Sequence, residues 1–412
     1  MLTSPLNELT ADTATAPPRR LVIALGALTM FGPLSTDMYL PGLPALTREL
    51  HASASTAQLT LTASMVGIAL GQFLAGPVSD SYGRRLPLLA GLSGFTVASL
   101  LCASSTSVWV LIAARLLQGL AGGSGIVIAR AIVRDLFRGS AAAETYALLG
   151  MINGLAPIFA PLIGGQILAF SSWRGIFVML VLIGAALLAM AYVQVPETLP
   201  RDRRQTGGLG AQARATFALL SQRRFVAAVA MYAFGFGALF AYVSGASYVL
   251  ENIYHFSPQA FSAVFASNAL GIVLMSTISH RFVGRSGPEL LLRTGLTVVA
   301  LASAATFIVC WRHAEVWLLL VSLFTLAAAQ GLVLPNGMAV AMGTRPDSLG
   351  SASGLIGLSQ FGLGAVIAPL VGLGGSHDAM PMAAVMVISA ALAMIAVRAY
   401  GGRAASGPHA TA

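Results

Sequence analysis

The chain has 412 residues, of which 57% are hydrophobic and only 9% are charged. Soluble domains carry about 25% charged residues, so this composition excludes a soluble protein and indicates one that lies in a membrane. The net charge is +9, and all 23 basic residues are arginine. Because the arginines lie in short segments between apolar runs and not on one face, we expect no nucleic-acid partner.

Apolar runs of about 20 residues are long enough to cross the hydrocarbon layer of a bilayer, and they predict twelve transmembrane helices. Residues 1–20 and 400–412 are expected to be tails on the cytoplasmic side, the first of them disordered. The spans are expected at residues 21–42, 56–79, 86–105, 108–134, 143–169, 174–195, 224–248, 259–281, 289–311, 315–341, 351–374 and 379–399.

A loop at residues 196–223 is predicted to link two halves of six spans each, residues 21–195 and 224–399. The halves share a repeat, since the sequence APLIG at 160–164 returns 208 residues later as APLVG, and Gly83 precedes Gly287 by 204 residues. The predicted fold is therefore an all-α membrane protein with two pseudo-symmetric six-helix halves. Parallel repeats around a central site are typical of transporters that work by alternating access.

The arginines also predict the orientation. With both termini in the cytoplasm, 19 arginines fall on the cytoplasmic side, and only Arg48, Arg174 and Arg312 fall outside. The remaining one, Arg115, lies within the fourth span. An excess of arginine in the loops on one side marks that side as cytoplasmic.

The first span contains one acid, Asp37, which we expect to be the only acid at membrane depth. A charged carboxylate inside a bilayer is costly, so it indicates a functional site; an aspartate that reaches the outer interface is the alternative. Arg115 lies at comparable depth, and we expect it to pair with Asp37. The positions 204 residues after Asp37 and Arg115 hold the uncharged residues Ala241 and Leu319, so the charged pair exists in one half only. This asymmetry favours a role in proton coupling over a structural ion pair.

The loop after the second span reads GPVSDSYGRR at residues 76–85 and resembles the signature of the major facilitator superfamily. The resemblance implies a cytoplasmic gate in which Asp80 faces the start of span eleven, near Gly350 and Ser351; ordinary topogenic charge is the alternative. In the second half Gly284 replaces the acid. The expected gate residues are Gly76, Asp80, Gly83, Arg84 and Arg85.

The fifth span is similar to the glycine and proline pattern that proton-driven exporters of this superfamily carry on the same helix. A packing seam without a specific role needs the same residues, and Ala160 departs from the pattern. The expected antiporter motif consists of Gly154, Pro157, Pro161, Gly164 and Gly165.

Together with LSTDMYLP at 34–41 and Trp173-Arg174, these motifs resemble the Bcr/CflA drug-resistance transporters over residues 21–400. The resemblance implies proton-coupled efflux of small, mostly apolar antibiotics, such as bicyclomycin or chloramphenicol, across the bacterial cytoplasmic membrane. A proton-coupled uptake symporter is the alternative. We expect a monomer that is not an enzyme and uses the proton gradient without a cofactor or metal, since the chain has no nucleotide-binding loop and only two cysteines.

Polar and aromatic residues within apolar spans are candidates for the substrate cavity. Buried amides need a hydrogen-bond partner or a wet cavity, whereas aromatic side chains often pack or face lipid instead. The expected cavity residues are Tyr39, Asn153, Phe236, Phe240, Tyr242, Asn268, Asn336 and Gln360.

Overall fold

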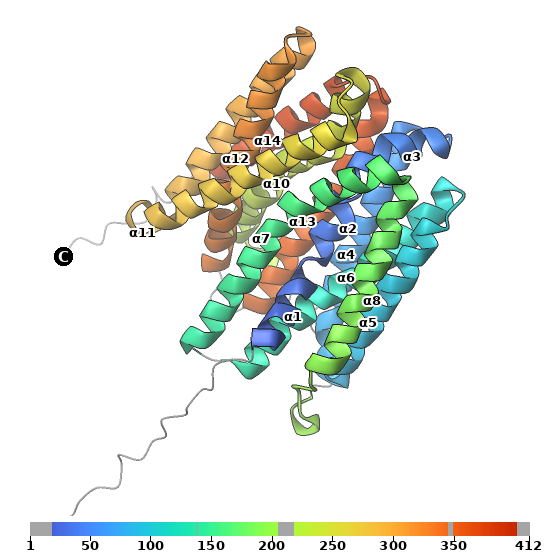
Figure 1. Ribbon diagram of the computed structural model, residues 1–412. Coiled ribbons are helices and arrows are strands. Elements are labelled where there is room, and N and C mark those ends of the chain that lie inside the picture. Colours follow the sequence, from blue (N-terminus) through green and yellow to red (C-terminus); the bar gives the residue numbers. More distant parts are fainter. Residues whose placement is uncertain (1–18, 138, 205–217, 345–348, 402–412) are drawn as a thin grey trace, which may run out of the picture.

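The computed structural model describes residues 19–137, 139–204, 218–344 and 349–401. The expected tails therefore lie almost entirely outside the described residues, as does much of the linker. In the described part the chain is helical and has no strand (Figure 1). The first half consists of α1 (Arg19–Thr29), α2 (Phe31–Asp37), η1 (Leu40–Gly42), α3 (Leu43–Glu49), α4 (Ala54–Tyr82), α5 (Arg85–Ala103), α6 (Val108–Leu136), α7 (Gly139–Phe170) and α8 (Trp173–Gln194).

The second half follows a short helical turn, η2 (Arg201–Arg203), in the linker. It consists of α10 (Arg223–Ser247), η3 (Tyr248–Ile253), α11 (Pro258–Trp311), α12 (Val316–Gly343), α13 (Leu349–Val371), η5 (Gly372–Gly374) and α14 (Met380–Gly401).

Serine side chains begin four of the long helices. The hydroxyls of Ser53, Ser107, Ser172 and Ser257 accept a hydrogen bond from a backbone N–H in the first turn of α4, α6, α8 and α11. Such N-caps satisfy amides that have no partner within the helix. The polar residues between apolar runs therefore set where these spans begin.

The first span is not one straight helix. It bends by 44° between α1 and the segment from Phe31 to Glu49. Pro33 explains the break, because a proline has no N–H to donate to the carbonyl of Thr29, four residues before it. The expected boundary at residue 42 is thus too early, since the helical segment reaches Glu49.

Spans eight and nine, which we expected to be separate, are two helices that meet at a kink and together make up the element α11 of 54 residues. At about 1.5 Å per residue α11 is far longer than one bilayer crossing, and it turns at Gly287, whose φ is 73° and ψ 155°. Gly83, 204 residues earlier, has φ 93° and ψ 166°. Counting α11 as two crossings and the bent first pair as one confirms the twelve predicted spans.

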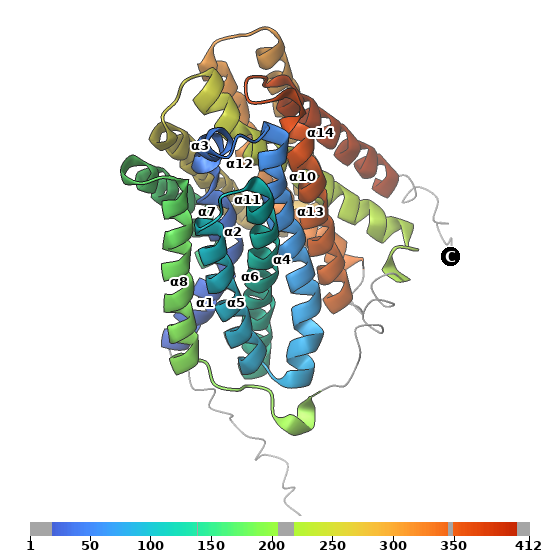
Figure 2. The same ribbon diagram turned by 90° about the vertical axis from the view of Figure 1, so that its right-hand side faces the viewer.

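The two halves meet along two pairs of helices. In the first pair α4 packs against α13, and in the second α7 packs against α11. Figure 1 shows α7 beside α11, and Figure 2 shows α4 beside α13. We call the end of the bundle that carries Arg84 and Arg134 the arginine-rich side, and the end that carries Glu49 and Glu251 the opposite side.

Candidate functional site

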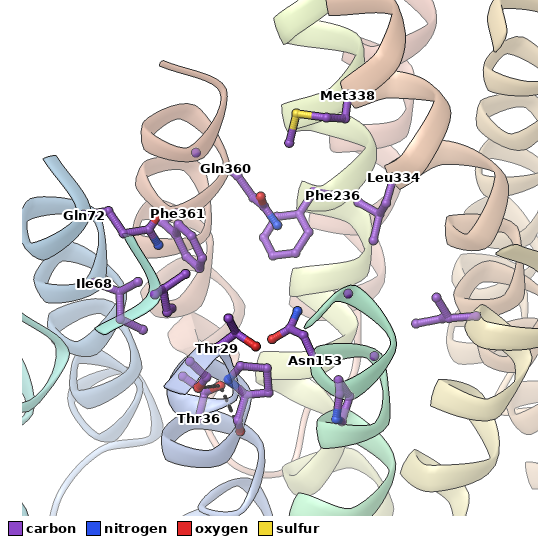
Figure 3. A pocket seen from close by; sticks show the side chains of 18 of the residues that line it. Thr29, Thr36, Ile68, Gln72, Asn153, Phe236, Leu334, Met338, Gln360 and Phe361 are labelled. Carbon is purple, nitrogen blue, oxygen red and sulfur yellow. Dashed lines mark hydrogen bonds between the residues drawn. The ribbon is translucent and has the colours of Figure 1, made fainter. Parts of the chain in front are cut away.

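A cavity of about 1430 Å³ lies between the two halves. Side chains from both halves point into it, among them Asn153, Phe236 and Gln360 (Figure 3). Its lining continues to Asp80 and Arg84 at the arginine-rich side. The cavity therefore opens towards that side.

Hydrogen bonds close the opposite side. The Thr47 and Tyr248 hydroxyls lie 2.7 Å apart, the Gln58 amide donates to the Ser244 carbonyl, and Gln259 donates to the Gly165 carbonyl. Two further hydrogen bonds join the two halves in this part of the bundle. They run from the Ser55 hydroxyl to the Pro369 carbonyl and from the Thr62 hydroxyl to the Ala365 carbonyl.

The glycines of the paired helices show the same asymmetry. A methyl group added at Gly76 or Gly154 would meet nothing within 4 Å. At Gly372 it would lie 2.6 Å from the Ser55 Cα, and at Gly165 3.0 Å from the Ser262 Cβ. The halves are thus in close contact at the opposite side and apart at the arginine-rich side.

Asp37 is the last residue of α2 and lies on the cavity wall. Its carboxylate accepts a hydrogen bond of 3.1 Å from the neighbouring Thr36 hydroxyl. The helix breaks directly after Asp37. The segment α2 packs against α7, and both elements contribute residues to the cavity wall.

The expected ion pair between Asp37 and Arg115 is absent from the described structure, and this expectation is corrected. Arg115 is completely buried and donates to the Ser35 carbonyl at 2.9 Å and to the Gln118 side chain at 2.5 Å. Its guanidinium also lies 5.0 Å from the centre of the Tyr39 ring. Arg115 therefore holds the backbone two residues before Asp37, while two of its other nitrogens have no hydrogen-bond partner among the described residues.

Six of the eight expected cavity residues lie on the wall. Three of them take part in hydrogen bonds between side chains: Tyr232 donates to Gln360 at 2.8 Å, and Asn268 donates to Tyr242 at 2.8 Å. The six are Asn153, Phe236, Phe240, Tyr242, Asn268 and Gln360.

Tyr39 and Asn336 do not line the cavity, so these two expectations are corrected. The Tyr39 hydroxyl lies 2.9 Å from the Thr60 hydroxyl inside the first half. The Asn336 amide donates to Ser279 at 2.7 Å, and only 2% of this residue is exposed. Each polar group is satisfied by a neighbouring helix, which the position within a span does not reveal.

The expected antiporter motif divides into two parts along α7. Gly154 and Pro157 line the cavity, whereas Gly164 packs against the Met38 backbone and Gly165 against Ser262 of the other half. One helix thus contributes both to the cavity wall and to the closed side.

The Gly83 loop forms a charge cluster within the first half. Arg84 is 2% exposed, and its guanidinium contacts Asp80 at 2.6 Å and Asp135 at 2.8 Å. Among the described residues, Asp80 forms no ion pair with the other half; its second partner is Arg134, at 4.0 Å. The side chains of its expected partners, Gly350 and Ser351, lie outside the described residues.

Glu197 holds the first part of the linker against this loop. Its carboxylate accepts the backbone N–H of Arg84 at 2.8 Å and that of Arg85 at 3.3 Å. Arg85 in turn donates to the Tyr192 carbonyl at 2.9 Å. Four of the five expected gate residues, from Asp80 to Arg85, are therefore brought together with two acids, Asp135 and Glu197, that we did not predict, whereas Gly76 lines the cavity.

Sequence reasoning also missed Arg130, which lines the cavity on α6. We counted this arginine among those on the cytoplasmic side. A signal was present, because Arg130 lies within the expected fourth span, residues 108–134. The cavity thus has a cation near its open end and the Asp37 carboxylate deeper inside.

The comparisons with known proteins agree with this architecture. The family described as the Major Facilitator Superfamily matches residues 25–369 and 243–405. A Bacillus subtilis (strain 168) protein named uncharacterized MFS-type transporter YdgK is 39% identical over 378 residues, which are 91% of this chain and 94% of that protein. A bicyclomycin resistance protein homolog of Haemophilus influenzae is 31% identical and covers 92% of this chain and 94% of its own length.

A chloramphenicol resistance protein of Pseudomonas aeruginosa is 30% identical over 85% of this chain and 82% of its own length. Among solved structures, an inward-facing, unoccupied bacterial homolog of the human lysosomal transporter Spinster superposes with a TM-score of 0.73 at 16% identity, over 93% of this chain and 98% of that one. The human organic anion transporter MFSD10 superposes with a TM-score of 0.67 at 19% identity, over 93% and 99% of the two chains. At these identities the solved structures support the fold alone.

Proposed function

The chain belongs to the Major Facilitator Superfamily, and from that premise we propose that it exports small, mostly apolar drugs in exchange for protons. The observation that carries the proposal is a carboxylate, Asp37, on the wall of a largely apolar cavity that is open at one side only. Relatives named for resistance to bicyclomycin and to chloramphenicol support this class of substrate.

We place the arginine-rich side in the cytoplasm of a bacterial cell, with both termini there. In this orientation the cavity faces the cytoplasm, so the conformation is the one that takes up drug. Export then requires the halves to rock until the arginine-rich side closes and the hydrogen bonds of the opposite side break. The drug leaves to the outside from the same cavity.

The proton binds to Asp37 in this mechanism. Charge on Asp37 is costly away from water, since its described hydrogen bonding is limited to the Thr36 hydroxyl. Protonation from the outside removes that charge, and release of the proton to the cytoplasm as drug binds restores it. Arg115 is a positioning residue, because it holds the Ser35 carbonyl and through it the turn that carries Asp37.

The test is drug-induced proton movement in proteoliposomes, followed with a pH dye. Asp37→Asn mimics the neutral acid and cannot cycle, so we expect it to lose proton movement and export while it still binds drug. The matched control is Glu315→Gln, which neutralises an exposed acid at the opposite side and should behave like the wild type. If Asp37→Asn exchanged protons for drug at the wild-type ratio, proton coupling would reside elsewhere.

A further inference from the structure

The seventh span is longer than its sequence indicates. We predicted its end at residue 248, but the helix continues as the π-helical turn η3 to Ile253. This extension places Glu251 within the span and corrects the expectation that Asp37 is the only acid at membrane depth. Single π-helical turns are rare and occur often at functional sites.

Glu251 lies beside the contact that closes the opposite side. Tyr248, three residues before it, bonds to Thr47 on α3 of the other half. The Glu251 Oε1 atom is enclosed by protein and accepts no hydrogen bond from any described residue. A carboxyl group thus lies next to the contact between the two halves, and one of its two oxygens accepts no hydrogen bond from a described residue.

The charged groups around η3 do not pair with this carboxyl. The elements packed on η3 are α10, α3 and α11. From α3, Arg48 forms no ion pair with Glu251 within 4.0 Å among the described residues, and Glu49 is engaged by Trp173 and Arg174. The first turn of α11 has no titratable residue, and His255 lies just before it. On the other side Asn252 donates to the Ser376 carbonyl, which is followed in the chain by His377 and Asp378.

A carboxyl group without a partner is far cheaper to enclose neutral than charged. We propose that Glu251 is a second proton-binding residue, and that it must be protonated for the opposite side to close. The inference rests on the proposed function and deepens it. While the opposite side is open, the carboxylate takes a proton from the outside medium and forms an O–H bond. Closure then traps that proton, and reopening of the opposite side returns it to the outside medium. The return of the empty transporter therefore requires an outside proton that Glu251 binds and later releases on the same side.

The experiment measures the opening of the opposite side without drug. Spin labels are attached at Ser104→Cys and Arg312→Cys, two exposed positions on different halves, with Cys102 and Cys310 replaced by alanine. The background is Asp37→Asn, so that Asp37 cannot contribute to the response. We expect the label distance to lengthen as the pH rises, because deprotonated Glu251 disfavours closure. Glu251→Gln should lose this response and keep the short distance at every pH.

Two further variants complete the experiment. Glu251→Asp keeps a titratable group and should keep a pH response, and Glu315→Gln, an exposed acid of the same side, should respond like the parent. An unchanged response in Glu251→Gln, or no response in the parent, overturns the proposal. The labels report conformation and not transport, so this result is independent of whether the protein proves to be a drug exporter.

Discussion

At the scale of single residues, the linker acid Glu197 shows how a polar group outside the membrane organises a loop. Burial raises the pKa of Glu197, but hydrogen bonds from the N–H groups of Leu199, Arg84 and Arg85 and the nearby Arg204 together hold it below its ordinary value of 4.5. Gly83 leaves room for this carboxylate, since its φ of 93° and the closeness of Glu197 both disfavour a side chain there.

The lowered pKa predicts a pH dependence. The charged form of Glu197 is favoured in the folded loop, so its stabilisation is complete above the ordinary pKa and is lost as the pH falls through the lowered one. We expect the Arg84 and Arg85 amides to exchange hydrogen faster below that pH, after correction for intrinsic rates. Glu197→Gln should exchange fast at neutral pH, whereas Asp202→Asn, an exposed acid of the same segment, should not. Wild-type protection in Glu197→Gln would contradict this role.

At the scale of helices, α7 serves the two sides of the bundle with different glycines. Gly165 lies against α11, where a Cβ would approach the Pro258 carbonyl oxygen to 3.1 Å. Gly154, eleven residues earlier, faces open space in this conformation. A single helix can therefore stabilise one closed side or the other, depending on which glycine is in contact.

The same substitution at these two positions should have opposite effects. Gly165→Leu overpacks the closed contact by about 1–3 kcal/mol and should shift the protein towards the state open at the opposite side. Gly154→Leu fits the present conformation but should hinder closure of the arginine-rich side. The measurement is labelling of a cysteine at Gln58, 1% exposed, by an impermeant maleimide from outside.

Relative to the parent, we expect faster labelling in Gly165→Leu and equal or slower labelling in Gly154→Leu. Both variants should lose export. If both moved the labelling rate in the same direction, the division of α7 into two contacts would be wrong.

At the scale of the whole molecule, the distribution of arginine predicts which side faces the cytoplasm. Arg84, Arg134 and Arg204 lie on the side to which the cavity opens, whereas Arg48 and Arg174 lie at the other end. If the arginine-rich side is cytoplasmic, as we propose, this conformation is inward-facing. With the reverse insertion the same conformation would be outward-facing.

Reporter fusions decide between these orientations. We expect alkaline phosphatase to be inactive when fused at Gly207 and active when fused at His51 or His313, with green fluorescent protein giving the complementary pattern. Phosphatase activity at Gly207 together with silence at His51 would reverse the topology and every assignment of side.

Features that depend on local chemistry could be predicted from the sequence alone. The twelve spans follow from the length of apolar runs, and the turn at Gly287 follows from the need for a positive φ that glycine meets without strain. The repeat between the halves is readable for the same reason, since Gly83 and Gly287 impose the same backbone turn. The position of Asp37 in an apolar span was sufficient to single it out.

Only the tertiary structure decided which groups meet. Asp37 and Arg115 share a depth, but the rotation of α6 directs the guanidinium to the Ser35 carbonyl and the Tyr39 ring. The sequence places Glu251 in a loop after the seventh span, whereas the π-helical turn η3 extends that span and includes Glu251 in it. Such contacts depend on helix rotation, on breaks and on which side is closed, because these are set by packing between segments far apart in the chain.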